Sequence, residues 1–210
     1  MVTAETSAFY TRLVEANHGP DVINETGSRP RGSYTRAMPG DVKIMVILQN
    51  PGKPEPIEEV KQRGKSGAQL AKTIWDMTGD VLDGLYYSKT FSKMREELAL
   101  LLTIKEEGVY DNVLVCNLIR CSTKNNAQPT PRSVSIAIPW LKEKIALWKP
   151  HKIITYSNWV KKNLEIHSVT YDSWLPHPAA RGNWMKQNVR KARVQAAQEE
   201  LERVPIRSYP

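Results

Sequence analysis

The chain has 210 residues, of which 40% are hydrophobic and 25% are charged. This composition is ordinary for a globular domain and excludes a wholly disordered or fibrous chain. The 30 Lys and Arg residues against 22 Asp and Glu residues give a net charge of +8. A chain this basic favours an acidic partner, and nucleic acid is the most common one.

Cysteine content and hydropathy exclude further classes of protein. Cys116 and Cys121 are the only cysteines, too few for a disulfide scaffold or for a four-cysteine metal or iron–sulfur site. No apolar run approaches the roughly 20 residues of a membrane span. We therefore expect a cytoplasmic protein that faces nucleic acid, without membrane, metal or cofactor.

Helical patterns and apolar runs alternate along the chain. A helical pattern over residues 9–16 precedes a loop, residues 18–40, that is rich in Gly, Pro, Ser and Asn. Short apolar runs bounded by turn residues predict buried strands, at residues 42–48, 112–119, 152–156 and 169–175. Helical periodicity is seen over residues 67–77, 88–102, 132–147, 158–164 and 184–203. Pro139 could interrupt the third of these helices.

This alternation predicts an α/β fold, a three-layer α/β/α sandwich around a central, mostly parallel four-stranded sheet. We expect one domain over residues 1–210, with an N-terminal helix and basic loop over 1–41 and a basic C-terminal helix over 184–203. Functional groups in such folds gather at the carboxyl ends of the strands. The loops after Leu48, Ile119 and Leu175 are therefore the places to look.

Acidic residues are missing from two long segments. Neither 112–142 nor 173–198 contains an Asp or Glu, although both contain Lys and Arg. Either these segments form a basic face that contacts phosphates, or solvated helix faces differ in charge without function. Their overlap with two strand-end loops favours the first interpretation.

The loop after the first strand is Gln49-Asn50-Pro51-Gly52. Asn-Pro-Gly is good turn chemistry and could be nothing more. Alternatively, the amide of Asn50 could hold a water or the edge of a substrate, because it offers both a donor and an acceptor.

Two later segments carry polar residues in equally constrained positions. Asn117 lies in an apolar strand, where an amide is costly to bury without partners; it is either a satisfied core residue or the floor of a pocket that reads a pyrimidine edge. His177 stands between Pro176 and Pro178, which restrict its backbone, and it could be structural or catalytic. Trp174 and Trp184 flank this loop as core residues or as a surface for stacked bases.

Taken together, the order and spacing of these segments resemble the uracil-DNA glycosylase superfamily. Residues 48–52 are similar to the first motif of the mismatch-specific branch, which carries Asn. Residues 115–121 look like the Asn-Val-Val-Lys-Cys segment of the iron–sulfur branch, and residues 177–179 are similar to the His-Pro-Ser loop of the superfamily. The resemblance covers about residues 42–184 and implies the fold predicted above.

The resemblance implies a role for each matching residue. Asn50 would position the water that attacks the deoxyribose C1′, and His177 would donate a hydrogen bond to O2 of the departing base. Gln49, Gly52 and Asn117 would line the base pocket and read the flipped base. The residues expected to contact DNA are Lys124, Arg181, Lys186 and Arg190, with Arg181 as the wedge that fills the space left by the base.

Departures from the family pattern shape the expected substrate. Leu48 stands in place of a Gly and Ala179 in place of a Ser. Gly52 stands where the uracil-strict branch has a Tyr, and residues 62–67 lack the usual stacking aromatic. The change at Gly52 and the missing aromatic predict a roomier, more polar pocket, which could accept uracil or a 5-substituted pyrimidine such as a modified phage cytosine. Leu48 and Ala179 support the non-catalytic alternative given below.

The sequence thus predicts a monomeric, monofunctional DNA glycosylase that leaves an abasic site, in base-excision repair or in defence against modified foreign DNA. A Schiff-base lyase activity through Lys53 is a minor variant of this hypothesis. The alternatives are a non-catalytic DNA-binding relative of the same fold and a structural or RNA-binding domain.

Overall fold

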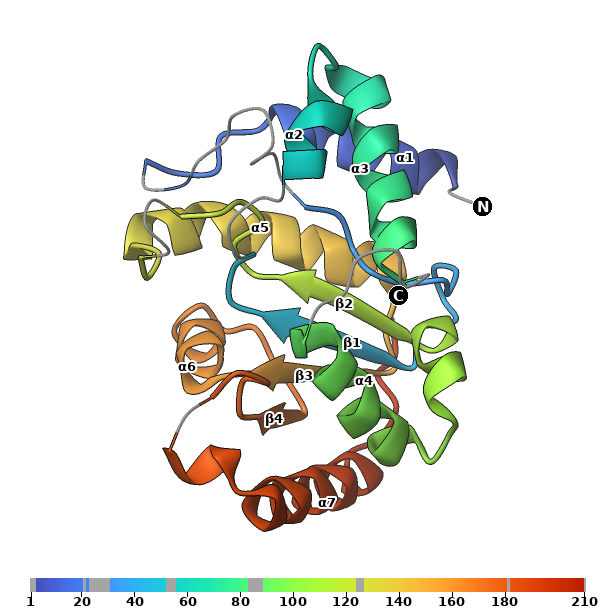
Figure 1. Ribbon diagram of the computed structural model, residues 1–210, viewed down its shortest axis with the longest axis vertical. Helices are drawn as coiled ribbons and strands as arrows, with labels where there is room; N and C mark the ends of the chain where they lie inside the picture. The colour runs from blue at the N-terminus through green and yellow to red at the C-terminus, as the bar shows by residue number, and fades with distance from the viewer. Residues whose placement is uncertain are drawn as a thin grey trace.

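The computed structural model describes residues 3–20, 22, 31–51, 56–82, 89–123, 127–180 and 182–209. Its centre is a four-stranded sheet with the strand order β2-β1-β3-β4 (Figure 1). The strands are β1 (Ile44–Leu48), β2 (Val113–Asn117), β3 (Lys152–Tyr156) and β4 (Ser173–Leu175), and every pairing is parallel. The predicted α/β sheet is confirmed, and it is wholly rather than mostly parallel.

The central strand β1 is buried on both faces because helices cover both sides of the sheet. Ile44, Val46 and Leu48 face one hydrophobic cluster, whereas Met45 and Ile47 face another. A parallel strand buried in this way reads as a continuous apolar run. This is why the strand could be recognised without any polar alternation.

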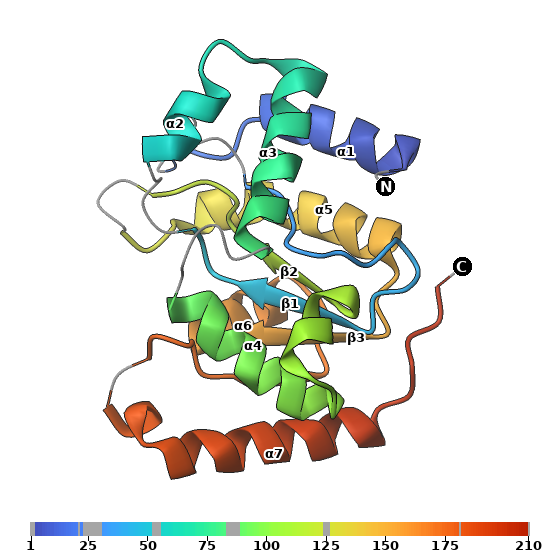
Figure 2. The ribbon, with the colours of Figure 1, turned by 45° about the vertical axis from the view of Figure 1, so that its right-hand side comes forward.

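Helices form the outer layers of the sandwich (Figures 1 and 2). On one face, α4 (Lys89–Leu102) and α7 (Gln187–Arg203) pack on the sheet together with the 3-10 helix η1 (Glu106–Asp111). On the other face lie α5 (Pro131–Trp148) and α6 (Asn158–Ile166). Beyond α5, a third cluster is built by α1 (Ala4–Glu15) and α3 (Gly67–Leu82). The remaining elements are α2 (Pro56–Gln62) and the 3-10 helix η3 (Gly182–Met185).

Some boundaries differ from those predicted by the sequence. β4 covers only the last three residues of the predicted strand 169–175. The preceding residue, Asp172, bonds to Ile153 through both its backbone N–H (2.7 Å) and its carboxylate (2.6 Å to the Ile153 N–H). A side chain thus takes a position that a ladder carbonyl would otherwise occupy, and regular pairing begins one residue later.

Pro139 does not interrupt α5, contrary to the break considered above. The helix runs through it because Ala137, Ile138 and Leu141 bury the opposite side against the sheet. Pro139 and Ser135, four residues before it, are exposed, so water can satisfy the carbonyl that loses its helical donor.

The outer edge of β2 is covered by the chain segment before β1. Tyr34 and Val115 exchange two backbone hydrogen bonds, of 2.8 and 3.0 Å, in an isolated antiparallel bridge. An uncovered edge strand exposes backbone groups that can pair with another chain. The bridge therefore closes one side of the sheet.

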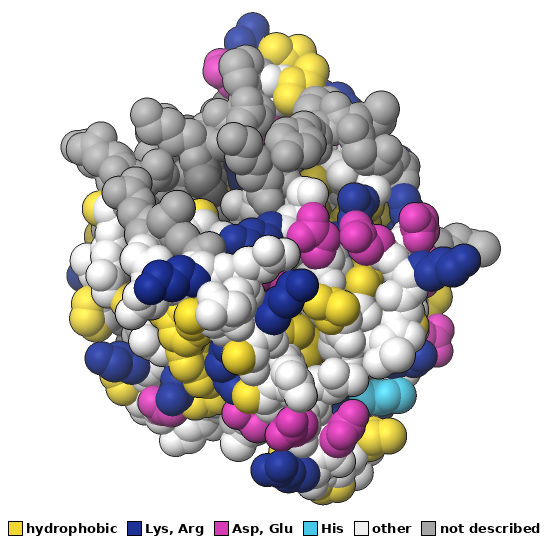
Figure 3. Space-filling view, turned by 60° about the horizontal axis from the view of Figure 1, so that its bottom comes forward, with side chains coloured by type: hydrophobic (Ala, Val, Ile, Leu, Met, Phe, Trp, Pro, Cys, Tyr) yellow, Lys and Arg dark blue, Asp and Glu magenta, His cyan; other side chains and the backbone are white. Residues whose placement is uncertain are grey.

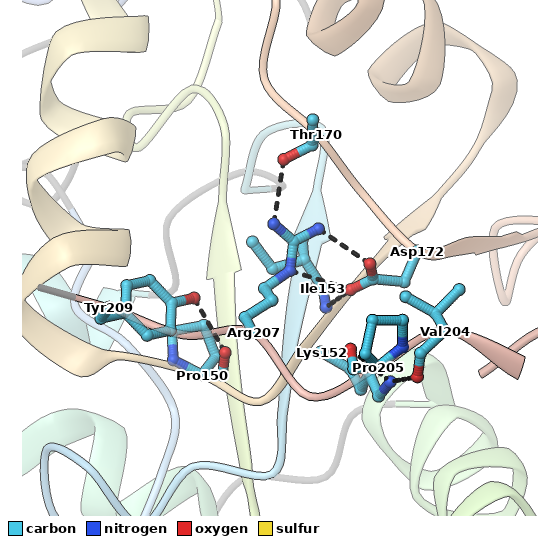
Figure 4. A network of polar contacts seen from close by, with 9 residues as sticks. All are labelled: Pro150, Lys152, Ile153, Thr170, Asp172, Val204, Pro205, Arg207 and Tyr209. Carbon is cyan, nitrogen blue, oxygen red and sulfur yellow. Dashed lines mark hydrogen bonds and ion pairs between the residues drawn. The ribbon is translucent and has the colours of Figure 1, made fainter. Parts of the chain in front are cut away.

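The segment 204–209 crosses the sheet at the end opposite the predicted site, and we call it the C-terminal strap (Figure 4). Arg207 contacts both carboxylate oxygens of Asp172, at 3.0 and 2.9 Å, and the hydroxyl of Thr170 at 2.9 Å. Tyr209 donates to the carbonyl of Pro150 (2.8 Å). The strap thus fixes the start of β4 against the neighbouring strand.

Candidate active site

The carboxyl ends of β1 and β2 place the first two motifs side by side. Leu48 pairs with Asn117 in the strand register. Beyond it, the carbonyls of Leu48 and Gln49 accept the N–H groups of Leu118 (2.7 Å) and Ile119 (2.9 Å). Sheet pairing therefore continues into the loop, and Gln49, Asn50 and Asn117 lie at one point of the sheet edge.

Asn50 is half-buried and held through its amide nitrogen. Nδ2 donates to the carbonyl of Pro51 at 3.1 Å and lies 3.5 Å from the hydroxyl of Thr123. Thr123 is itself fixed, because it donates to the carbonyl of Ala127 at 2.6 Å. Within the described part of the chain, the amide oxygen of Asn50 has no hydrogen bond. That oxygen is available as an acceptor for a water.

Asn117 is only 5% exposed. No described residue forms a hydrogen bond with its side-chain amide. This does not support the interpretation of Asn117 as a core residue whose amide is satisfied by neighbouring groups. Asn117 ends β2, where the sheet meets the loops of the predicted site. This placement fits an amide that pairs with a ligand.

His177 reaches the same edge from β4. It follows Leu175 by two residues, and Leu175 pairs with Tyr156 at the end of β3. Only β3 separates β4 from β1, so two strand spacings, about 10 Å of backbone, separate the His177 loop from the Asn50 loop. A flipped nucleotide is large enough to contact both loops.

The imidazole of His177 has a defined tautomer. The backbone N–H of Ala179 donates to Nδ1 at 3.1 Å, so Nδ1 is the acceptor and Nε2 carries the hydrogen. Burial, and then the positive charge of Arg190, lower the pKa of His177 below its usual 6.5. The half-buried ring is therefore neutral at pH 7 and presents an N–H donor.

Arg190 does not lie where a phosphate contact requires it to be. It is 5% exposed and forms an ion pair with Glu97 at 2.6 Å. Its other nitrogens donate to the carbonyls of Pro176 (3.2 Å) and His177 (3.0 Å). The predicted DNA contact of Arg190 is thus corrected: its guanidinium is occupied within the protein.

Of the other predicted contact residues, Lys186 is exposed at the start of α7. Gln49 is half-buried beside Asn50. The predicted residues Gly52, Lys124 and Arg181, as well as Lys53, lie outside the described residues. Their roles, like those of Lys186 and Gln49, stay predictions.

The two tryptophans beside the His177 loop pack on each other. The ring centroids of Trp174 and Trp184 are 5.9 Å apart in an edge-to-face arrangement. Arg193 and Lys161 lie over the ring of Trp174, at 5.1 and 5.8 Å, in favourable cation–π positions. Both tryptophans are partly buried, which favours a structural role over an open surface for stacked bases.

Charges on the face shown in Figure 3 are mixed, with Lys and Arg lying among Asp and Glu. The basic segments of the sequence therefore do not make this face uniformly basic.

The described residues include no cluster of three or more His, Cys, Asp or Glu that could hold a metal ion. Nor does this part of the chain contain a helix long and apolar enough to cross a membrane.

Sequence reasoning missed the residues that support the site. Arg190 lies on the apolar stripe of α7, four and seven residues before Val194 and Ala197, and Glu97 lies three residues after Met94 on the buried face of α4. A charged residue at a buried helical position needs a partner of opposite charge. That signal was present in the sequence.

In a comparison with protein-family models, residues 36–202 match the uracil DNA glycosylase superfamily. Comparison with curated proteins gives no match. The matched segment contains the whole sheet and the three strand-end loops that carry Asn50, Asn117 and His177. It covers most of the chain, and this protein therefore belongs to the uracil DNA glycosylase superfamily.

Proposed function

We propose that this protein is a monofunctional DNA glycosylase that flips a pyrimidine out of DNA and hydrolyses its N-glycosidic bond. One observation carries the proposal. The amide oxygen of Asn50 and the side-chain amide of Asn117, neither of which bonds to a described residue, lie at one edge of the sheet with the Nε2–H of His177. These groups supply an acceptor, an edge reader and a donor.

The proposed reaction needs little nucleophilic force. As the bond between C1′ and the base nitrogen breaks, its electron pair passes to the base, and the sugar becomes oxocarbenium-like. Water held by Asn50 adds to C1′, and its proton leaves to solvent. Asn50 is too weak a base to remove that proton, so its part is to orient the water.

His177 acts on the leaving base in this scheme. Negative charge develops on the pyrimidine O2, and a fixed donor aimed at that oxygen stabilises the transition state. The imidazole is neutral and its Nδ1 accepts a hydrogen bond from Ala179. The ring therefore carries a single hydrogen, on Nε2, which it can donate to the base. Asn117 would select the base by pairing with its edge, after the nucleotide has left the stack.

The substrate we propose is uracil or a pyrimidine with a bulky 5-substituent, such as a modified phage cytosine. Support comes from the residues that surround the expected pocket. Gly52 replaces a Tyr, and residues 62–67 contain no aromatic. The role would be base-excision repair or defence against modified foreign DNA, performed by a monomer.

The experiment is an alkali-cleavage assay on end-labelled duplexes. The panel contains uracil opposite G and opposite A, thymine opposite G, and 5-hydroxymethylcytosine and glucosylated cytosine. We expect cleavage of at least one substrate, lost in Asn50→Ala and in His177→Ala. His167→Ala is the matched control, because His167 ends α6 at the opposite edge of the sheet.

Each outcome of this assay has a defined meaning. Cleavage of the uracil substrates alone contradicts the proposal of a roomy pocket but supports the proposed glycosylase reaction. Binding of DNA without cleavage of any duplex favours a non-catalytic relative. The departures from the family pattern at Leu48 and Ala179 support that alternative. Equal binding of RNA and DNA without an abasic product favours an RNA-binding domain.

A further inference from the structure

We propose that Arg190, braced by Glu97 and Tyr156, is the residue that positions His177 for its contact with the base. The inference rests on the proposed function and extends it to a group that touches neither substrate nor water. Arg190 is thus a positioning residue. Its partners come from three elements that are distant in sequence.

The guanidinium of Arg190 connects the His177 loop to α4. Its Nε donates to one carboxylate oxygen of Glu97 at 2.6 Å. Its Nη1 and Nη2 donate to the consecutive carbonyls of His177 (3.0 Å) and Pro176 (3.2 Å). One planar group therefore fixes both peptide units that lead into and out of the imidazole-bearing residue.

The loop's own backbone supplies one donor to these two carbonyls: the Ala180 N–H donates to the His177 carbonyl at 2.8 Å. Among the described residues, no backbone N–H reaches the Pro176 carbonyl, which Arg190 therefore holds. Pro176 and Pro178 have no N–H, and the N–H of Ala179 is used by the imidazole. The carbonyls of the loop cannot be tied by the neighbouring strand, because β4 ends at Leu175. A rigid fork with several donors suits two adjacent acceptors better than an ammonium group does.

Glu97 fixes the position of the guanidinium in turn. The second carboxylate oxygen of Glu97 accepts from the hydroxyl of Tyr156 at 3.1 Å. Glu97 is 6% exposed and Tyr156 is fully buried. The pair therefore has little freedom to move. The loss of either charged partner leaves the other buried and unpaired, which is costly.

The arrangement also sets the electrostatic surroundings of His177. Arg190 from α7 is the charged group in direct contact with the loop, with Glu97 from α4 and Tyr156 from β3 behind it. The Arg190 charge acts with burial to lower the pKa of His177. Removal of that charge should therefore raise the imidazole pKa. Release of the Pro176 carbonyl, with only the Ala180 N–H left on the His177 carbonyl, should let the ring leave its single tautomer.

The experiment compares Arg190→Met, Arg190→Lys and Glu97→Gln with Arg203→Met. Arg203 is an exposed arginine of the same helix, with 77% side-chain exposure, and serves as the matched control. Nitrogen-15 NMR of the imidazole reports the tautomer and pKa of His177. Single-turnover excision and DNA affinity, on the best substrate of the panel, report the chemical step and binding separately.

In Arg190→Met we expect a rise in the His177 pKa, a mixture of tautomers, and a rate constant lower by about tenfold to 100-fold, since small displacements of a catalytic group cost this much. DNA affinity should change less than about twofold, because the residue is buried. Arg190→Lys should keep the pKa near that of the wild type without restoring the rate. If Arg190→Met does not fold, Arg190→Lys still tests the loss of rate, and Glu97→Gln tests whether an unbraced guanidinium disturbs the His177 tautomer and the rate.

An unchanged His177 tautomer, pKa and rate in a folded Arg190→Met or Glu97→Gln protein would overturn the proposal. Equal losses of rate and of DNA affinity would do so too, because they would indicate a general structural role. If wild-type protein cleaves no substrate, the proposed function fails by itself. The NMR comparison still tests whether Arg190 positions His177.

Discussion

His177 illustrates how a few local contacts give one side chain a chemical role. Flanking prolines limit its backbone, the Ala179 N–H selects its tautomer, and Arg190 holds the adjacent carbonyls. The motif that contains His177 could be found in the sequence, because the prolines are adjacent to it. The contribution of Arg190 could not be assigned there, because its partner Glu97 lies 93 residues away.

The state of His177 predicts a pH dependence of excision. Protonation places a hydrogen on Nδ1, and the Ala179 N–H then loses its acceptor. Burial and Arg190 lower the pKa of His177 from 6.5, so the neutral form persists at neutral pH. We expect the single-turnover rate constant to be level at neutral pH and to fall only in acid, as the pH passes below that lowered pKa.

The measurement is a rate profile from about pH 4.5 to about pH 8, around the range in which histidines titrate. His177→Gln is the control, because an amide can donate a hydrogen bond but does not titrate. The acidic fall should be absent from this variant. If the same fall remains, with the same midpoint, another group is responsible for it.

At the scale of elements, burial and periodicity account for what was predicted well. The apolar runs that became β1, β2 and β3 are buried on both faces, so each could be seen without knowledge of its neighbours. The short β4 and the helix α2 could not be delimited in this way. β4 begins only after Asp172, whose side chain and the C-terminal strap replace regular pairing there, and those contacts are far apart in sequence.

The contact between α1, α5 and the segment before β1 contains a buried polar group with a testable consequence. Lys144 is fully buried and donates to Ser33 at 2.6 Å, and Ser33 also accepts from Tyr10 at 2.6 Å. Burial, followed by the charge of Arg120, lowers the pKa of Lys144 to about 7. An unfolded lysine keeps its proton until about pH 10.4.

This difference predicts that the free energy of unfolding rises with pH between about pH 7 and about pH 9. In that range the unfolded chain binds the Lys144 proton more strongly than the folded protein does, so each step upward in pH favours the folded state. The contribution is at most about 1.4 kcal/mol per pH unit. Lys144→Met should lose this slope, whereas Lys142→Met, an exposed position of the same helix, should keep it.

Urea unfolding at several pH values measures the effect as a difference between the two variants. That difference removes the part of the slope that comes from burial of Tyr10, whose pKa burial raises in both variants. Parallel slopes for the two variants would show that Lys144 is already neutral, or equally charged, in both states.

At the scale of the whole molecule, parallel topology is what unites the site. Asn50, Asn117 and His177 are distant in sequence, yet parallel strands end at one edge and place their loops there. This much follows from the predicted fold. The positions of the basic residues could not be predicted from the sequence with the same success. Whether an arginine contacts solvent or a buried carboxylate depends on tertiary packing, as Arg190 shows.

The measurement that tests the central claim most directly is the mass of an oligonucleotide after incubation with the protein. Hydrolysis of the N-glycosidic bond predicts an intact strand that has lost one base and gained one water, together with a free pyrimidine. A strand cut at the abasic position would contradict the monofunctional mechanism. An unchanged mass for every substrate of the panel, with DNA bound, would contradict glycosylase activity itself.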